Sequence, residues 1–81
     1  MSYLYRLDGI TPTLCTKPNL APLMAKAKEA TSVVGTLKEV DAGKGRAFIL
    51  FGDNVDDDKR AQYLLHLGIG APPQLHLADN P

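Results

Sequence analysis

The chain has 81 residues, a hydrophobic share of 44%, and nine Lys and Arg against nine Asp and Glu. This length predicts a single domain over residues 1–81, and the one cysteine excludes an internal disulfide or a cysteine-based zinc site. No run approaches the roughly 20 apolar residues that span a bilayer, so we expect a soluble cytoplasmic protein with no membrane contact. Because the net charge is zero, we expect any polyanion-binding patch to be local.

The N-terminal residues 2–7 alternate in character and predict a half-buried strand. In the favoured register, Tyr3, Tyr5 and Leu7 face the core. Leu4 and Arg6 then face outward, because the opposite register would bury an arginine without a partner. Asp8 and Gly9 close this strand.

A connector with two prolines leads to residues 19–31, which predict an amphipathic helix. Asn19 is the predicted N-cap, and Pro22 falls in the first turn, where a missing N–H group is harmless. The apolar positions follow helical spacing and form the predicted buried stripe: Leu20, Leu23, Met24 and Ala27. Residues 32–40 begin with β-branched side chains and predict a second strand.

The C-terminal half predicts a hairpin, a second helix and a last strand. Residues 41–45 form the predicted turn of a hairpin, with two glycines that can supply any positive φ angle the turn needs, and residues 46–51 form the most apolar run, a third strand. A helix is predicted over residues 57–67, with carboxylates at its start and a glycine after its end. Its predicted inward face comprises Ala61, Leu64 and Leu65, with Tyr63 at its margin. Residues 74–78 alternate again and predict a fourth strand, with His76 facing outward.

The predicted element order is therefore β-α-β-β-α-β, the ferredoxin-like arrangement of the α+β class. Two right-handed crossovers and one hairpin produce an antiparallel sheet with both helices on one face. The alternative is that the first or last short strand is irregular, which leaves a smaller sheet. The face without helices is the open face on which the functional hypotheses rest.

The stretch "KGRAFILF", from Lys44 to Phe51, resembles the third-strand signature of RNA-recognition-motif domains. That signature has a basic residue and a glycine, followed by aromatic residues separated by small and aliphatic ones. Chain length and strand order are also similar to this family, so the resemblance loosely covers the whole chain. It implies a sheet that binds single-stranded RNA, with Lys44, Arg46, Phe48 and Leu50 on the open face and Phe48 stacked on a base.

Three features of the sequence depart from that family pattern. Arg46 stands where the family has an aromatic residue. Strand alternation places Tyr3 and Tyr5 in the core, so Phe48 is the one aromatic side chain predicted on the open face. The net charge is zero, whereas RNA-binding domains usually carry an excess of Lys and Arg. Nucleic-acid binding is therefore the alternative hypothesis.

Other reactive residue types do not form a recognisable site. The stretch "LDGITPTLC", which ends at Cys15, resembles the loop of small heavy-metal-binding domains, but a soft metal needs two thiolates. The acidic residues 53–58 have calcium-loop residue types without the required glycine and glutamate, and they favour a helix start. His66 and His76 are predicted on different layers, and Cys15 is predicted to be a semi-buried packing residue. We therefore predict no enzyme, no catalytic residue, no metal and no cofactor.

The leading hypothesis is a non-catalytic binding module that acts through the open sheet face or a sheet edge. A protein partner, or a second copy of this chain in a homodimer, is favoured because arginine and aromatic residues together anchor protein interfaces. The predicted binding residues are Leu4, Arg6, Lys44, Arg46, Phe48, Leu50 and His76. The chain also has the size of small accessory or inhibitor proteins carried by phages and plasmids, a comparison that rests on length alone.

Overall fold

The computed structural model describes residues 2–69 and 74–78, with side chains described for residues 2–69. The described residues form strands β1 (Ser2–Leu7), β2 (Thr36–Asp41), β3 (Arg46–Phe51) and β4 (Gln74–Ala78). They also form helices α1 (Lys17–Thr31) and α2 (Asp57–Leu67), and a short 3₁₀ helix, η1 (Ala42–Lys44), between β2 and β3. The predicted α+β class is confirmed.

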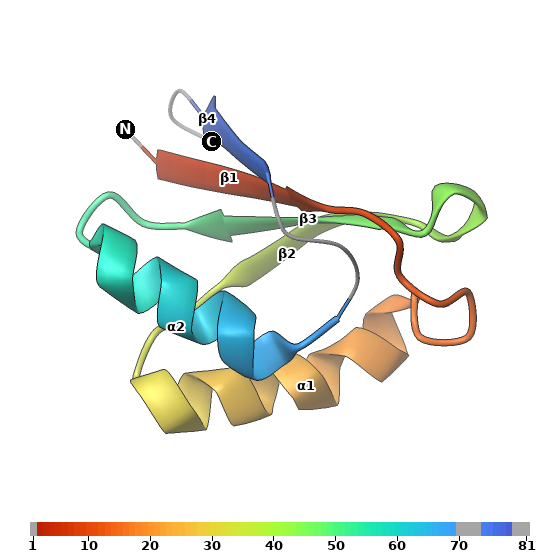
Figure 1. Ribbon diagram of the computed structural model, residues 1–81, viewed down its shortest axis with the longest axis horizontal. Coiled ribbons are helices and arrows are strands. Elements are labelled where there is room, and N and C mark those ends of the chain that lie inside the picture. The colour runs from red at the N-terminus through yellow and green to blue at the C-terminus, as the bar shows by residue number, and fades with distance from the viewer. Residues whose placement is uncertain (1, 70–73, 79–81) are drawn as a thin grey trace.

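The strands form one antiparallel sheet with the order β2-β3-β1-β4. β1 pairs with β3 on one side and with β4 on the other. A register shift between Leu37 and Glu39 marks a bulge in the outer strand β2. Both helices lie on the same side of the sheet, so neither covers the opposite face (Figure 1).

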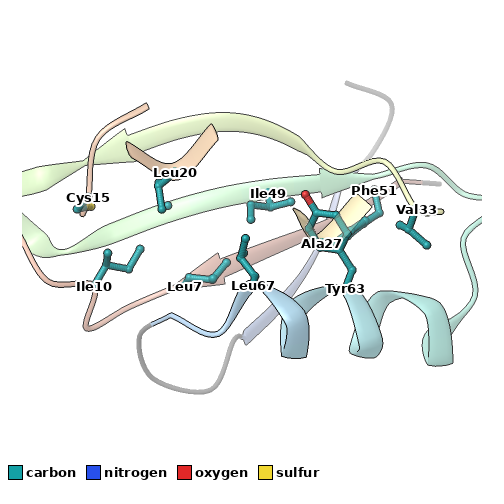
Figure 2. Packing of buried hydrophobic residues seen from close by; sticks show 11 residues of the cluster. Leu7, Ile10, Cys15, Leu20, Ala27, Val33, Ile49, Phe51, Tyr63 and Leu67 are labelled. Atoms are coloured by element: carbon teal, nitrogen blue, oxygen red, sulfur yellow. The ribbon is translucent and has the colours of Figure 1, made fainter. Parts of the chain in front are cut away.

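The hydrophobic core lies between the helices and the sheet. Ala47, Ile49 and Phe51 alternate along β3 and are at most 1% exposed. The ring of Phe51 contacts Tyr5 and Tyr63 edge to face, with ring centroids 5.6 and 5.2 Å apart. The other buried apolar residues of the core are Leu7, Ile10, Cys15, Leu20, Ala27, Val33 and Leu67 (Figure 2).

Helix α1 begins at Lys17, three residues earlier than the predicted cap implies, because Thr16 and not Asn19 is its N-cap. The Thr16 hydroxyl oxygen accepts a hydrogen bond from the backbone N–H of Asn19 at 3.2 Å. The side chain of Asn19 instead donates to the carbonyl oxygen of Thr13 at 2.6 Å. Pro18 occupies the first turn, and Pro22 lies further inside the helix than predicted. Both residue types cap helices well, so composition alone does not choose between the two starts.

Strand β2 begins at Thr36, four residues later than predicted. Ser32 adopts the left-handed conformation, with φ 61°, and its N–H donates to the carbonyl oxygen of Lys28 at 2.7 Å, which ends α1. Gly35 has no room for a side chain, because a Cβ there would lie 2.9 Å from Cγ2 of Ile49. The residues predicted to start the strand therefore form a tight link from α1 to β2.

Helix α2 has the predicted bounds, but it buries a different face. Arg60, Tyr63 and Leu67 are buried, whereas Ala61 and Leu65 are exposed, Leu65 by 78%. The prediction that Ala61 and Leu65 face inward is therefore wrong. It failed because it assigned apolar side chains alone to the core, whereas the buried face of α2 includes Arg60.

Arg60 is only 3% exposed because it has partners on β1 and beside its own helix. Its guanidinium forms an ion pair with Asp57 and donates to the carbonyl oxygen of Val55. The Nε group donates to the hydroxyl of Tyr5 at 3.1 Å, and the guanidinium carbon lies 3.7 Å from the ring centroid of Tyr3. These contacts hold α2 against β1, with Tyr3 and Tyr5 on the helix side as predicted.

Candidate binding face of the sheet

The candidate site is the face of the sheet that α1 and α2 leave uncovered. Along β3, the half-buried residues Arg46, Phe48 and Leu50 alternate with the core residues and lie on this face. The register places Leu4 opposite Leu50 and Arg6 opposite Phe48, and residues directly opposite one another point to the same side of a sheet. We call Leu4, Arg6, Arg46, Phe48 and Leu50 the open face. These are five of the seven predicted binding residues.

The apolar part of the open face consists of Leu4, Phe48 and Leu50. Leu4 and Leu50 are paired across β1 and β3, and Phe48 lies two residues from Leu50 along the same strand. All three side chains are half-buried, so each keeps apolar surface in contact with water. The backbone of His76 pairs with Leu4 on β4, while the predicted outward direction of its side chain lies outside the described residues.

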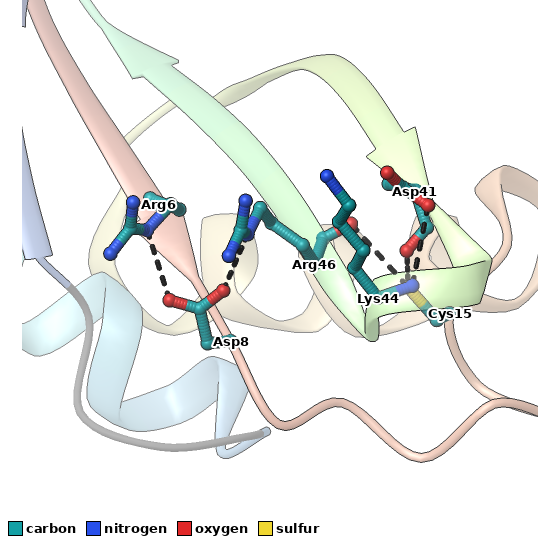
Figure 3. Close-up of polar contacts among 6 residues, drawn as sticks. All are labelled: Arg6, Asp8, Cys15, Asp41, Lys44 and Arg46. Carbon is teal, nitrogen blue, oxygen red and sulfur yellow. Dashed lines mark hydrogen bonds and ion pairs between the residues drawn. The ribbon is translucent and has the colours of Figure 1, made fainter.

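Asp8 joins the two arginines of the open face, as Figure 3 shows. Its carboxylate accepts a hydrogen bond from Nε of Arg46 at 2.6 Å and another from Nε of Arg6 at 2.9 Å. The bond from Arg46, together with the charges of both arginines, holds the pKa of Asp8 below its usual range, against a smaller opposing effect of desolvation. The carboxylate is therefore ionised at neutral pH and offsets part of the positive charge of this surface.

Sequence reasoning missed this bridge, although a signal for it was present. Asp8 was interpreted only as the residue that closes the first strand. Because Arg6 and Asp8 are two residues apart, an extended backbone places both side chains on the same face. That spacing, together with the predicted outward direction of Arg6, was enough to suggest the contact. The side-chain exposure of the three bridged residues is between 26% and 32%.

Carboxylates also border the open face along β2. Glu39 pairs with Phe48, and Asp41 pairs with Arg46. Simple alternation would put Glu39 on the same side as Leu37, which packs against the core. The bulge between these two residues inserts one extra position, so Glu39 lies on the open face instead. The side of the open face at β2 is acidic, and the side at β1 carries Arg6.

Lys44 lies at the hairpin end, in η1 rather than in β3, and its side chain is exposed. Its backbone N–H donates to the side chain of Asp41 at 3.3 Å (Figure 3). Cys15 lies under the same hairpin and is fully buried, with Sγ 3.6 Å from the carbonyl oxygen of Asp41 and 3.5 Å from that of Arg46. Cys15 is thus a packing residue, more deeply buried than the sequence predicts.

A groove of about 670 Å³ lies at the opposite end of the sheet, where α1 ends and α2 begins. It is lined by the segment after α1, by the end of β3 around Leu50 and Phe51, and by Asn54 and Val55 before α2. Among the lining residues that the structure describes, Lys59 has the one ionisable side chain. An isolated lysine beside hydroxyl and aliphatic groups forms no acid–base pair, so the groove offers no recognisable catalytic chemistry.

The described residues contain no group of three or more His, Cys, Asp or Glu side chains placed to hold a metal ion. None of the helices in the described part of the chain is long and apolar enough to cross a membrane.

Comparison with known proteins adds no relative: no protein-family model, no curated protein and no solved structure matches this chain. The resemblance of residues 44–51 to RNA-recognition-motif domains consequently stays a prediction from one octapeptide. The function has to be inferred from the residues of the open face.

Proposed function

We propose that this protein is a small non-catalytic binding module that engages a protein partner through the open face. The observation that supports this proposal is the cluster of Leu4, Phe48 and Leu50 on a side of the sheet that neither helix covers. Charged residues border the cluster, with Arg6 and Arg46 at the hairpin end and Glu39 on the β2 side. An apolar centre with a polar rim, containing aromatic and arginine side chains, is the usual composition of a protein interface.

We also propose that the fold is the ferredoxin-like arrangement. The element order and the strand order β2-β3-β1-β4, with β1 antiparallel to both of its neighbours, support this assignment. In that arrangement both crossover connections run through the helical layer. The face opposite the helices is then available for binding over its full width.

The charges of the open face favour a protein over single-stranded RNA. A phosphate backbone is attracted by clustered Lys and Arg, and here Asp8 bridges the two arginines while Glu39 lies across from Phe48. Single-stranded RNA also needs aromatic platforms for its bases. Tyr3 and Tyr5 pack against the core, which leaves Phe48 as the aromatic residue of the open face.

Partner retention by variants of the open face tests the protein proposal. Immobilised wild-type protein, Phe48→Glu and Leu65→Glu would be exposed to an extract of the source cells, and the retained proteins compared. Leu65→Glu is the matched control because it introduces the same charge on the outer surface of α2. We expect the same proteins with wild type and Leu65→Glu and their loss with Phe48→Glu. Equal retention by Phe48→Glu would contradict the proposal, provided that all three proteins show the same melting curve.

Titration of a labelled mixed-sequence single-stranded RNA at low salt tests the alternative. Stacking on an aromatic side chain is worth ~1–3 kcal/mol per base, so RNA binding through Phe48 should weaken about fivefold or more in Phe48→Ala. It should also weaken as salt is added. We expect no binding. Binding that shows both dependences would replace the protein partner with RNA.

A further inference from the structure

We infer that the partner of the open face is a second copy of this chain, bound face to face around a two-fold axis that runs along β3. The inference rests on the proposed function and makes it specific. It starts from the distribution of charge across the sheet at the level of Phe48. Glu39 lies on the β2 side of Phe48 and Arg6 lies on the β1 side.

Suppose that the two-fold axis runs between two stacked sheets and parallel to β3. The rotation then leaves the position of each residue along the strand direction unchanged. It exchanges the two sides of the sheet, so β1 of one copy lies over β2 of the other. Arg6 of each copy then faces Glu39 of the other copy, and symmetry repeats the contact. At the position of Phe48, the open face is thus complementary to the same surface of a second molecule.

The same axis brings the apolar residues together at the centre of the interface. Phe48 and Leu50 lie on the axis and face their own counterparts. Leu4 faces Thr36, because both are paired with Leu50 in the register. Sheets stacked in this way lie about 10 Å apart with their strands within about 30° of one another, which lets side chains of this size interdigitate.

At the hairpin end of the sheet, this arrangement brings charges of both signs next to one another. Arg46 faces its own counterpart on the axis, and Asp8 of each copy faces Asp41 of the other copy, with an Arg46 guanidinium beside each of these carboxylates. Since Asp8 is already bridged to Arg46 within one chain, the like charges of the two Arg46 residues are offset locally.

The other two-fold axis that lies between the sheets, perpendicular to the strands, fits less well. If it passes at the level of Phe48, Arg6 faces Arg6 and Glu39 faces Glu39. If it passes one residue nearer Leu50, Arg6 faces Leu4, so a charge is desolvated against an apolar side chain. If it passes one residue nearer Arg46, Arg6 faces Asp8, but Glu39 faces Asp41 and Phe48 is separated from its own counterpart. The contact between Arg6 and Glu39, together with the self-contacts of Phe48 and Leu50, therefore favours the axis along β3.

Charge reversal combined with sedimentation equilibrium tests this register. Wild type should dimerise as its concentration is raised. Arg6→Glu alone and Glu39→Arg alone each place like charges in contact at two symmetric positions, and each should weaken the dimer about tenfold or more. An equimolar mixture of the two variants restores both opposite-charge contacts, so it should form a heterodimer with an affinity close to that of wild type. Glu29→Arg, the same reversal on the exposed surface of α1, should leave the dimer unchanged.

The possible outcomes separate this inference from the proposed function. A wild type that stays monomeric overturns the dimer, while loss of partner retention in Phe48→Glu would still support a different protein partner. A dimer that is insensitive to both reversals overturns the register along β3. Should Arg6→Glu fail to fold, Arg6→Gln and Glu39→Gln remove the attraction without adding repulsion. Each must then weaken the dimer several-fold, and a dimer of unchanged affinity in both contradicts the inference.

Discussion

The two faces of the sheet are built from alternate residues of the same strands, yet only one of them is covered. Ile49 and Leu50 are adjacent aliphatic residues at the centre of β3, and Ile49 is fully buried under the helices while Leu50 is half-buried on the open face. Hydrophobicity does not distinguish these two positions. The crossover connections do, because both place their helix on the same side. An open face that keeps leucine and phenylalanine therefore retains apolar surface that a partner can cover.

The charged groups of the two faces differ in the same way. On the covered face, Arg60 is buried and its contacts with Asp57, Tyr5 and Val55 lie within the chain, so removing any one of them leaves a buried charge poorly compensated. On the open face, Arg6 and Arg46 share Asp8 while about a quarter to a third of each side chain stays exposed. The buried charge fixes the position of α2. The exposed charges can exchange partners at a small cost, which suits a surface that associates reversibly.

Truncating the adjacent residues Ile49 and Leu50 tests this comparison most strongly. Ile49→Ala removes a fully buried side chain from the core and should lower the free energy of unfolding by ~2–5 kcal/mol. Leu50→Ala removes a half-exposed side chain and should cost less than about 1.5 kcal/mol. Urea unfolding at micromolar concentration measures both. Equal losses would mean that the open face is packed as tightly as the covered face within a single chain.

Substitutions of two glycines in the hairpin should give the next largest difference in stability. Gly45 has φ 59°, and a Cβ there would lie 2.7 Å from the carbonyl oxygen of Ile10. Its own carbonyl oxygen accepts a hydrogen bond from the N–H of Ile10 at 2.9 Å, which ties the hairpin to the core. We expect Gly45→Ala to cost ~1–3 kcal/mol, seen as a lower melting temperature.

Gly43→Ala is the matched control in the same turn. A Cβ at Gly43 would meet its nearest neighbour, a side-chain oxygen of Asp41, at 3.5 Å, and φ there is not positive. This substitution should leave the melting temperature nearly unchanged. Similar melting temperatures for the two variants would show that the close contact between Gly45 and Ile10 does not hold the hairpin against the core.

Part of this organisation could be predicted from the sequence because short-range patterns determine it. Alternation in β1 correctly placed Tyr3 and Tyr5 toward the helices. The acidic start and the glycine end of α2 gave its bounds, since Asp56 caps the helix through a 2.9 Å bond from the N–H of Lys59 and Gly68 has φ 63°. Such signals act within a few residues, so they do not depend on how the rest of the chain packs.

The features that were missed depend on contacts between distant segments. The inward rotation of Arg60 requires Tyr5, which is 55 residues away along the chain. The position of Glu39 on the open face requires the bulge in β2, and a bulge leaves little trace in composition. The charge pattern that favours a second copy of this chain follows from Glu39. Periodicity alone therefore could not predict which charged side chains lie on the open face.

The smallest expected effect concerns Asp8, the one carboxylate that bridges the arginines of the open face. Because the folded state lowers the pKa of Asp8, its ionised form is stabilised on folding. This contribution is fully present above the unfolded-state pKa of about 3.9 and is lost as the pH falls through the lower folded-state value. We expect Asp8→Asn to lower the melting temperature slightly at pH 7, by a few degrees at most, since all three side chains are partly exposed. The difference from wild type should shrink as the pH falls below about 4. A difference that is the same at pH 7 and pH 3 would mean that the carboxylate of Asp8 contributes through its shape and not through its charge.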